Sequence, residues 1–296
     1  MIKNLKKRKA VNGSMKAVIS SIAVFNIVIV ILIFLFLFVN SLKFFNEVSI
    51  FEFLSGKIWI PSSGRFGMLP LLLGSFWVAL IAMSIAVPLG IISAVYLSEY
   101  ANKKIRETLK IIIETMAAIP SVVLGYIGIV VVAEPVRRIF DLDTGFTALT
   151  GGIILGFMAL PTIISMSDDA LKAVKPSYRY ASLALGANRL ETVVKVIFPA
   201  ALPGIFASTM LGAGRIIGET MVVLMVTGNS PNVNAGPLRA VTTMTATIAS
   251  ETGQVARNTT HYYSLFAIGF ILFLITLSIN TLSSYFVEKE RKRMKG

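Results

Sequence analysis

The chain has no cysteine and only one histidine, His261, among its 296 residues. Without thiols it cannot form disulfide bonds or thiolate metal sites. The sequence offers no basis for a metal-ligand cluster or a nucleophilic triad, and it lacks the glycine-rich motif that holds nucleotide phosphates. These absences argue against an enzyme, and we expect neither a cofactor nor a bound metal.

Charged residues are also scarce, at 15% of the chain, whereas hydrophobic residues make up 55% and the mean hydropathy is +0.78. Soluble proteins contain about 25% charged residues, so the composition predicts a membrane protein. The net charge of +13 would suggest nucleic-acid binding in a soluble protein. In a membrane protein it is typical of lysines and arginines at cytoplasmic helix ends, so we expect membrane lipid around the chain and no nucleic acid.

Six stretches have the length of about 20 mostly apolar residues that a spanning helix needs. The sequence therefore predicts an all-α polytopic membrane protein with six transmembrane helices. The first stretch is too long for a signal peptide and ends in bulky residues, so we interpret it as an uncleaved span. Pro88 and Pro120 are expected to bend the spans that contain them. The six stretches are 17–42, 66–98, 111–133, 147–167, 205–227 and 263–287.

Lysine and arginine are distributed unequally between the two predicted sides. With the N-terminus inside, the inner segments carry twenty of these residues and the outer loops seven. Because positive charges favour the cytoplasmic side, we predict that both termini are cytoplasmic in a multi-pass protein of the cell membrane. The predicted organisation is a basic N-terminus at 1–16, a first helix at 17–42, a five-helix domain at 66–287 with an inner loop at 168–204, and a basic tail at 288–296.

Arg215 and Glu219 are the first candidate functional residues, since ionised residues inside a span are costly and usually face a cavity. On one continuous helix their spacing of four puts them on one face, together with Ser208 and Gly212. We interpret this polar stripe as lining a path. Gly214 and Gly218 form a neighbouring small-residue stripe where another helix could pack.

The function of the charged pair has two interpretations. Arg215 and Glu219 could neutralise each other as a structural pair inside the bundle. Alternatively, the planar guanidinium of Arg215 recognises an anionic substrate. Glu219 could then accept a hydrogen bond from protonated phosphate, a bond that sulfate cannot donate at neutral pH.

The inner loop 168–204 is the second candidate region. Gly186 is expected to end one short helix in a left-handed conformation, and Asn188 with Glu191 has the spacing of a capping box for the next. The apolar side chains of Leu183, Leu185 and Leu190 have no evident core in so short a loop. A cytoplasmic partner or the membrane surface would cover them.

This loop resembles the EAA loop of ABC importer permeases, which docks on the ATPase subunit in that family. The matching positions are Ala181, Ser182, Gly186 and Pro199, whereas Tyr180 replaces the usual glutamate. The resemblance implies the type I ABC importer permease fold, and it implies that the segment from Ala181 to Gly186 transmits motion.

Four further segments resemble the C-type permease subunit of phosphate-specific importers. The most specific of them is 214–221, which reads Gly-Arg-Ile-Ile-Gly-Glu-Thr-Met; the others are 66–70, 119–123 and 184–187. The resemblance implies a phosphate importer in which this chain pairs with a second permease subunit, ATPase subunits and an external phosphate-binding protein. Arg215 would contact the substrate and Glu219 would orient Arg215, while ATP hydrolysis would belong to a partner chain.

Three other functions remain open on the sequence. An ABC permease could carry another oxyanion, such as sulfate or molybdate. A secondary anion transporter could use Arg215 and Glu219 to couple protons, and would then transport without an ATPase. A structural or signalling membrane protein would tolerate loss of the Arg215 charge.

Overall fold

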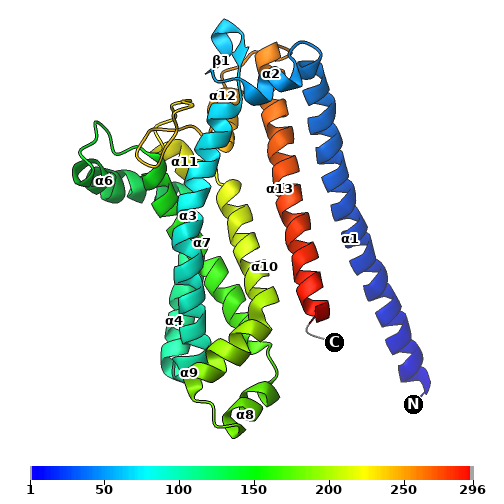
Figure 1. Ribbon diagram of the computed structural model, residues 1–296. Helices are drawn as coiled ribbons and strands as arrows, with labels where there is room; N and C mark the ends of the chain where they lie inside the picture. Colours follow the sequence, from blue (N-terminus) through cyan, green and yellow to red (C-terminus); the bar gives the residue numbers. More distant parts are fainter. Residues whose placement is uncertain (1, 294–296) are drawn as a thin grey trace.

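Long helices and one small hairpin make up the described part of the chain (Figure 1). The computed structural model describes residues 2–293, and the side chains of residues 15–289. Residue 1 and residues 294–296, the extremities of the two predicted basic tails, lie outside the described residues. Within residues 2–293, five helices are long and apolar enough to cross a membrane, or six if one bent pair counts as a span. The all-α polytopic fold is confirmed.

The five long helices lie at five of the predicted spans: α1 and α13 extend beyond their spans at both ends, α7 only at its end and α10 only at its start, whereas α3 lies within its span. Pro88 lies inside α3, which continues past it without a break. Both described chain ends point toward the same end of the bundle as the loop between α7 and α10 (Figure 1). The helices are α1 (Ile2–Phe45), α3 (Leu69–Val95), α7 (Ala148–Lys172), α10 (Phe198–Ile217) and α13 (Thr260–Arg293).

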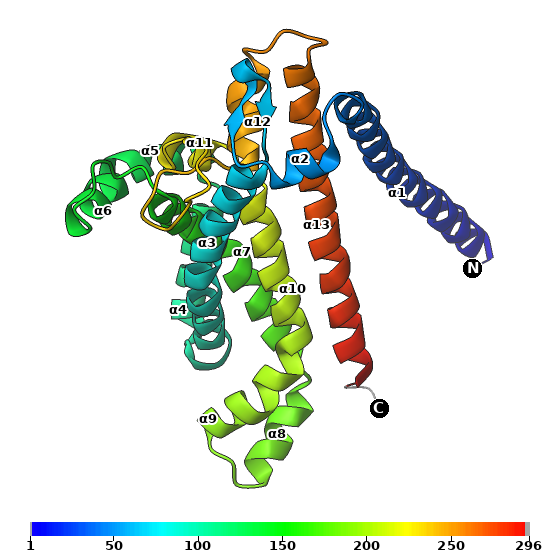
Figure 2. The ribbon, with the colours of Figure 1, turned by 45° about the horizontal axis from the view of Figure 1, so that its top comes forward.

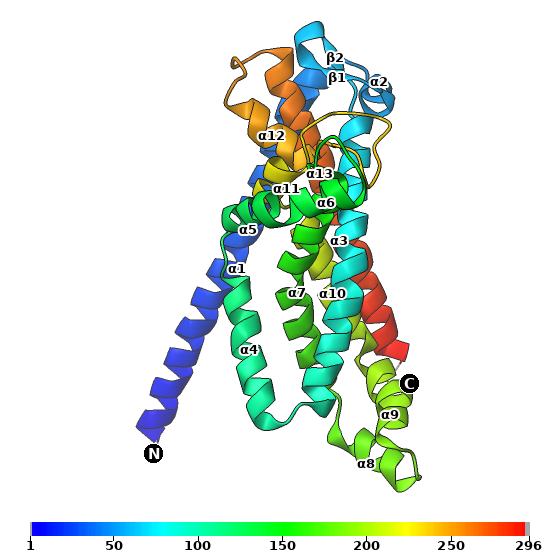
Figure 3. The ribbon, with the colours of Figure 1, turned by 90° about the vertical axis from the view of Figure 1, so that its left-hand side faces the viewer.

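The third predicted span is not one straight helix. It consists of α4 (Lys103–Ala117) and a second arm in which α5 (Ser121–Ile127) continues through a π-helical segment into α6 (Glu134–Ile139). The two arms meet at 93°, and Figure 3 shows α5 and α6 lying across the bundle. Pro120, just before α5, explains the break, because proline lacks an N–H and disfavours helical geometry in the residue before it. The bend predicted at Pro120 is confirmed.

The fifth predicted span also ends early. Helix α10 ends at Ile217, and a short helix, α11 (Met221–Val226), begins after a turn of three residues. A single helix over 205–227 is therefore wrong. Gly218 follows α10 directly, and glycine is a poor helix former, so it favours a helix end at this position.

Short elements cover the end of the bundle opposite the chain termini. They are α2 (Ile50–Ser55), the antiparallel strands β1 (Trp59–Ile60) and β2 (Arg65–Phe66), and α12 (Met244–Thr252). Glu251 of α12 connects β1 and α13, because its carboxylate accepts a hydrogen bond from Trp59 Nε1 at 2.9 Å and lies 2.7 Å from His261 Nε2. Segment 228–262 folds back onto the helices, and Met244 N–H donates to the Ser75 hydroxyl of α3.

The central packing joins α3 to α7 at small residues. A Cβ atom on Gly152 would lie 2.5 Å from the Cβ of Ile81, so only glycine fits there. Close helix approach at small residues is the usual packing mode in membranes. By contrast, α1 packs on α13 through rings such as Phe34 and Phe270, whose centroids are 5.8 Å apart, and it lies at the periphery in Figure 2.

Candidate functional site

Arg215 lies in the last turn of α10, with an exposed side chain. Its Nη1 donates a hydrogen bond to the hydroxyl of Thr162 on α7, across 3.2 Å. Among the described side chains, no carboxylate is within ion-pair distance of this guanidinium. The arginine is therefore oriented by a neutral hydroxyl and keeps an uncompensated positive charge.

Glu219 lies beyond the end of α10 and does not pair with Arg215. Its Oε1 accepts hydrogen bonds from the backbone N–H groups of Met221 at 2.9 Å and Val222 at 3.2 Å. The predicted shared helical face of Arg215 and Glu219 is wrong, and so is the interpretation of the two as a neutralised pair. The reason is local: the carboxylate satisfies the free N–H groups of α11, which a continuous helix would have bonded internally. Thr162, not Glu219, orients Arg215.

Hydroxyl groups from distant segments surround the turn that contains Glu219. Thr245 Oγ1 donates to the backbone carbonyl of Glu219 at 2.7 Å. Both residues line a small cavity of about 10 Å³, which Ser75 and Thr243 also border. The second carboxylate oxygen, Oε2, accepts no hydrogen bond from a described residue. Sequence reasoning missed Thr162 and these hydroxyls because they come from separate segments of the chain and share no motif.

The face of α10 that carries Ser208 and Gly212 packs against α7 and does not line a path within this chain. Ser208 is buried, and its hydroxyl lies 2.6 Å from that of Ser167 on α7. A Cβ atom on Gly212 would lie 2.7 Å from Ile163, so this face packs against α7. A Cβ atom on Gly214, in contrast, would have no described neighbour within 4 Å outside its own stretch of helix. The open face is therefore the one that carries Gly214.

The loop between α7 and α10 forms a helical hairpin, which we call the α8–α9 hairpin, of α8 (Pro176–Ala184) and α9 (Arg189–Thr192). Gly186 has φ +85°, the left-handed conformation that favours glycine. Asn188 Oδ1 accepts from Glu191 N–H at 2.9 Å, and Glu191 Oε2 accepts from Asn188 N–H at 3.0 Å. The predicted left-handed turn and capping box are confirmed.

The other predicted hairpin positions differ in exposure. Ala181 is exposed on α8, whereas Ser182 is buried and its hydroxyl lies 2.9 Å from that of Thr192. Pro199 is exposed in the first turn of α10, where proline is favourable. The hairpin end presents an apolar surface of three leucines, with exposed fractions of 46% for Leu183, 89% for Leu185 and 62% for Leu190.

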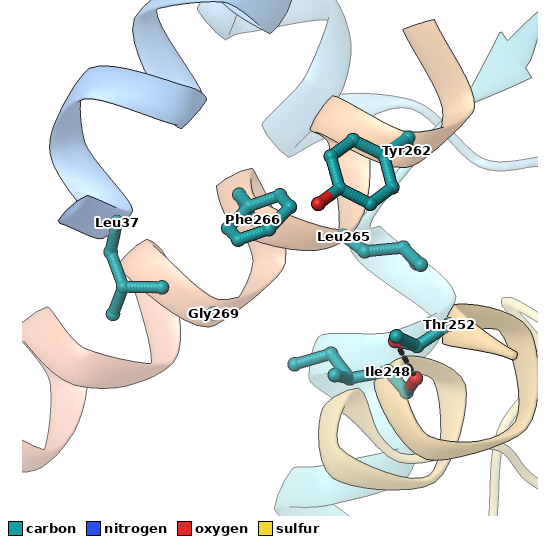
Figure 4. Close-up of a pocket in the computed structure, with 7 residues that line it drawn as sticks. All are labelled: Leu37, Ile248, Thr252, Tyr262, Leu265, Phe266 and Gly269. Atoms are coloured by element: carbon teal, nitrogen blue, oxygen red, sulfur yellow. Dashed lines mark hydrogen bonds between the residues drawn. The ribbon is translucent and has the colours of Figure 1, made fainter. Parts of the chain in front are cut away.

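A separate apolar cavity of about 260 Å³ lies between α1, α12 and α13. Figure 4 shows Leu37, Ile248, Leu265 and Phe266 around it, together with Tyr262. None of the described residues that line this cavity is charged, so it offers no positive charge to attract an anion. The candidate site is therefore the region of Arg215.

Comparison with known proteins identifies the family. Residues 86–292 match the family described as binding-protein-dependent transport system inner membrane component. The chain belongs to this family. Its members are membrane permease subunits of ABC importers, and the chain is accordingly a multi-pass protein of the cell membrane.

Curated relatives cover most of the chain. A protein of Bacillus subtilis named probable ABC transporter permease protein YqgH is 38% identical, over 81% of this chain and 79% of its own length. The phosphate transport system permease protein PstC of Mesorhizobium japonicum is 32% identical, over 79% of this chain and 77% of its own length. The probable PstC of Methanocaldococcus jannaschii is 28% identical, over 87% of each chain. The similarity to C-type phosphate permeases is thus confirmed.

Solved structures show the fold. An inward-facing MetNI methionine ABC transporter chain is 19% identical and has a TM-score of 0.59, with 79% of this chain and 99% of that chain covered. A bacterial alginate ABC transporter, solved with a pentasaccharide-bound periplasmic protein, has a TM-score of 0.59 at 15% identity, with 84% and 86% covered. The predicted type I ABC importer permease fold is confirmed.

Proposed function

We propose that this chain is the permease subunit of an ATP-driven phosphate importer. The observation that carries the proposal is the state of Arg215: its guanidinium is exposed, bonded to a neutral hydroxyl, and free of any carboxylate among the described residues. A permanent, planar cation of this kind binds oxyanions through paired hydrogen bonds. The relatives named PstC support phosphate as the oxyanion.

Glu219 supplies selectivity in this proposal. Its Oε1 holds the turn before α11, while Oε2 is available to accept a hydrogen bond. Monoprotonated phosphate can donate that bond, whereas sulfate at neutral pH cannot and is repelled by the carboxylate. Arg215 thus attracts the anion, and Glu219 favours an anion that carries a proton to donate.

The proposed partners follow from the surfaces that the chain leaves uncovered. The α8–α9 hairpin docks on an ATPase subunit through Ala181, Gly186 and the exposed leucines, while the buried Ser182 holds α8 to α9. The open face at Gly214 packs against a second permease subunit, and the opposite end of the bundle receives an external phosphate-binding protein. Both termini are then cytoplasmic, since they point to the same end as the hairpin (Figure 1).

The test is anion uptake by the complete complex in proteoliposomes. We expect ATP-dependent phosphate uptake that Arg215→Ala abolishes without loss of assembly. Preferential uptake of sulfate or molybdate by the same complex would identify another oxyanion importer. Uptake by this chain without an ATPase would identify a secondary transporter, and undiminished uptake by Arg215→Ala would refute the role of Arg215.

A further inference from the structure

A buried carboxylate lies where the α8–α9 hairpin meets the bundle. Glu99 is part of the π-helical turn Tyr96–Tyr100 that ends α3, and only 5% of its side chain is exposed. A negative charge at the carboxyl end of a helix opposes the helix dipole, and a buried charge needs a partner. The position is therefore unfavourable for a glutamate without a compensating contact.

Two arginines of the hairpin supply that contact. Arg179 Nη2 on α8 donates to Glu99 Oε1 at 2.5 Å. Arg189 donates to the backbone carbonyl of Glu99, and its guanidinium lies 5.0 Å from the ring centroid of Tyr100. Arg189 is the first residue of α9, where the dipole also disfavours a cation. Glu99 and Arg189 thus each lie at the end of a helix where the dipole disfavours their charge. Each is compensated by a contact between α3 and the α8–α9 hairpin.

Hydrogen bonds between α8 and α9 hold the hairpin together, so its two helices move as one. The buried hydroxyls of Ser182 and Thr192 join α8 to α9 at 2.9 Å, and Ala187 N–H donates to the carbonyl of Ser182. From α9 the chain continues through the π-helical segment Val193–Ile197 into α10, which carries Arg215. The hairpin is thus connected to α10 by the chain itself and to α3 by Glu99.

Helix α3 in turn packs closely on α7. A Cβ atom on Gly90 would lie 2.6 Å from Cγ2 of Ile163, which is the neighbour of Thr162. Because dense packing transmits displacement, α3 and α7 shift together. Displacement of Glu99 therefore reaches the helix whose hydroxyl orients Arg215.

We propose that Glu99 is a positioning residue that clamps the α8–α9 hairpin to α3, so that hairpin movement reaches both walls of the Arg215 site, α10 directly and α7 through α3. This inference rests on the proposed function, since it takes an ATPase partner to move the hairpin. Without the clamp, hairpin movement would no longer reach α3 and would reach α7 only through α10, so ATP hydrolysis would be less tightly coupled to transport.

The first test measures the distance between the hairpin and α3. Because this chain has no cysteine, spin labels can be attached at Ser177→Cys on α8 and Ile92→Cys on α3 without removing any thiol of this chain. Both positions are exposed. In the complete complex, pulsed electron paramagnetic resonance should give one narrow distance that is the same without nucleotide and with a non-hydrolysable ATP analogue.

In Glu99→Gln we expect this distance distribution to broaden and to shift when nucleotide binds. The variant should fold, because a cavity of about 330 Å³ borders Glu99, Arg179 and Arg189 and admits water to the unpaired arginine. The matched control is Glu107→Gln, at an exposed position on α4, which should behave as the parent. Parent-like distances in Glu99→Gln, or a nucleotide-dependent distance in the parent, would overturn the clamp.

The second test measures coupling. In Glu99→Gln the amount of phosphate moved per ATP hydrolysed should fall at least about 5-fold, the scale of one lost charge-assisted hydrogen bond, while the ATPase subunit still co-purifies. If Glu99→Gln does not fold, Arg179→Lys replaces it, since it keeps the charge but loses the fork geometry. Arg179→Lys should broaden the distances less strongly, and parent-like distances and coupling in that variant would refute the clamp.

The clamp and the phosphate importer can be refuted separately. The distance measurement does not depend on which anion is carried. A parent complex that moves no phosphate would refute the proposed function, even with the clamp intact. If the complex imports phosphate but Glu99→Gln changes neither the α8–α3 distances nor the amount of phosphate moved per ATP, the clamp alone is refuted.

Discussion

Arg215 on α10 and Thr162 on α7 are joined by a hydrogen bond of 3.2 Å, so two helices jointly fix the direction of one cation. The bond links the C-terminal turn of α10 to the middle of α7, on the side where Gly214 leaves the surface open. Any anion that binds here meets a guanidinium whose position depends on both helices.

Thr162→Val tests this orientation, because valine keeps the shape of threonine and loses the hydroxyl. We expect the KM for phosphate to rise about 5-fold, as for one hydrogen bond to a partly exposed charged group. ATP-stimulated turnover at saturating phosphate should be nearly unchanged. Thr108→Val, at an exposed position on α4, is the control. An unchanged KM in Thr162→Val would mean that the hydroxyl does not position Arg215 for binding.

Arg215→Lys separates charge from geometry. Lysine retains the positive charge but lacks the planar pair of donors that fits an oxyanion. We expect kcat/KM for phosphate uptake to fall about 10-fold or more. Arg257→Lys, on the exposed segment between α12 and α13, should have no effect. Full activity in Arg215→Lys would show that a point charge is sufficient.

Glu219→Gln tests the selectivity mechanism. The amide oxygen of glutamine can accept the same two bonds from Met221 and Val222, so the turn should persist, while the repelling charge is lost. Sulfate uptake relative to phosphate uptake should rise by about 10-fold or more, the scale of one charge-assisted contact. Glu52→Gln on the exposed face of α2 is the control. If the ratio of sulfate to phosphate uptake is unchanged in competition assays, Glu219 does not discriminate between the two anions.

Leu185→Asp tests the docking surface on the α8–α9 hairpin. Leu185 is 89% exposed, so aspartate does not disturb the fold of this chain but places a charge in an apolar contact. We expect the affinity for the ATPase subunit to fall about 10-fold or more, as at an interface hot spot. Leu238→Asp, in the segment between α11 and α12, should leave co-purification intact. Normal binding by Leu185→Asp would exclude this end of the hairpin from the contact.

Gly214→Leu tests the face reserved for a second permease. A Cβ atom at this glycine would have no described neighbour within 4 Å outside its own stretch of helix, so the thermal stability of the chain alone should not fall. The yield of the two-permease complex should decrease, because close packing at glycine tolerates no large side chain. Gly152→Leu is the contrasting variant, since a Cβ there lies 2.5 Å from Ile81 and the chain itself should be destabilised. A full yield of complex with Gly214→Leu would place the partner elsewhere.

Local signals made part of this structure predictable. The turn at Gly186 and the capping box of Asn188 and Glu191 depend on neighbouring residues only, so the sequence predicts the α8–α9 hairpin correctly. The positions of the long helices follow from uninterrupted apolar length. The bend at Pro120 was also predictable, but its size of 93° depends on how α5 packs against other helices.

The arrangement at Arg215 was not predictable in the same way. Hydropathy continues through Val222 and Val223, so it gives no sign that the helix stops at Ile217. The stop involves the Glu219 carboxylate, which bonds to the backbone of the next helix. The burial of Ser208 and the contact of the Thr162 hydroxyl with Arg215 depend on tertiary structure, because both require α7 to lie beside α10.

The break at residues 118–120 divides the third span into two arms that meet at 93°. The 15 residues of α4 rise about 22 Å, less than the roughly 30 Å of a hydrocarbon core, so α4 alone is too short to cross it. Because the two arms are nearly perpendicular, rotation of α4 about its axis moves α5 and α6 sideways. Gly125 of α5 packs on Met225 of α11, the helix that follows Glu219. In the proposed importer, a twist applied at the end of the bundle that carries the α8–α9 hairpin would become a lateral push near Glu219, without any helix sliding along its length.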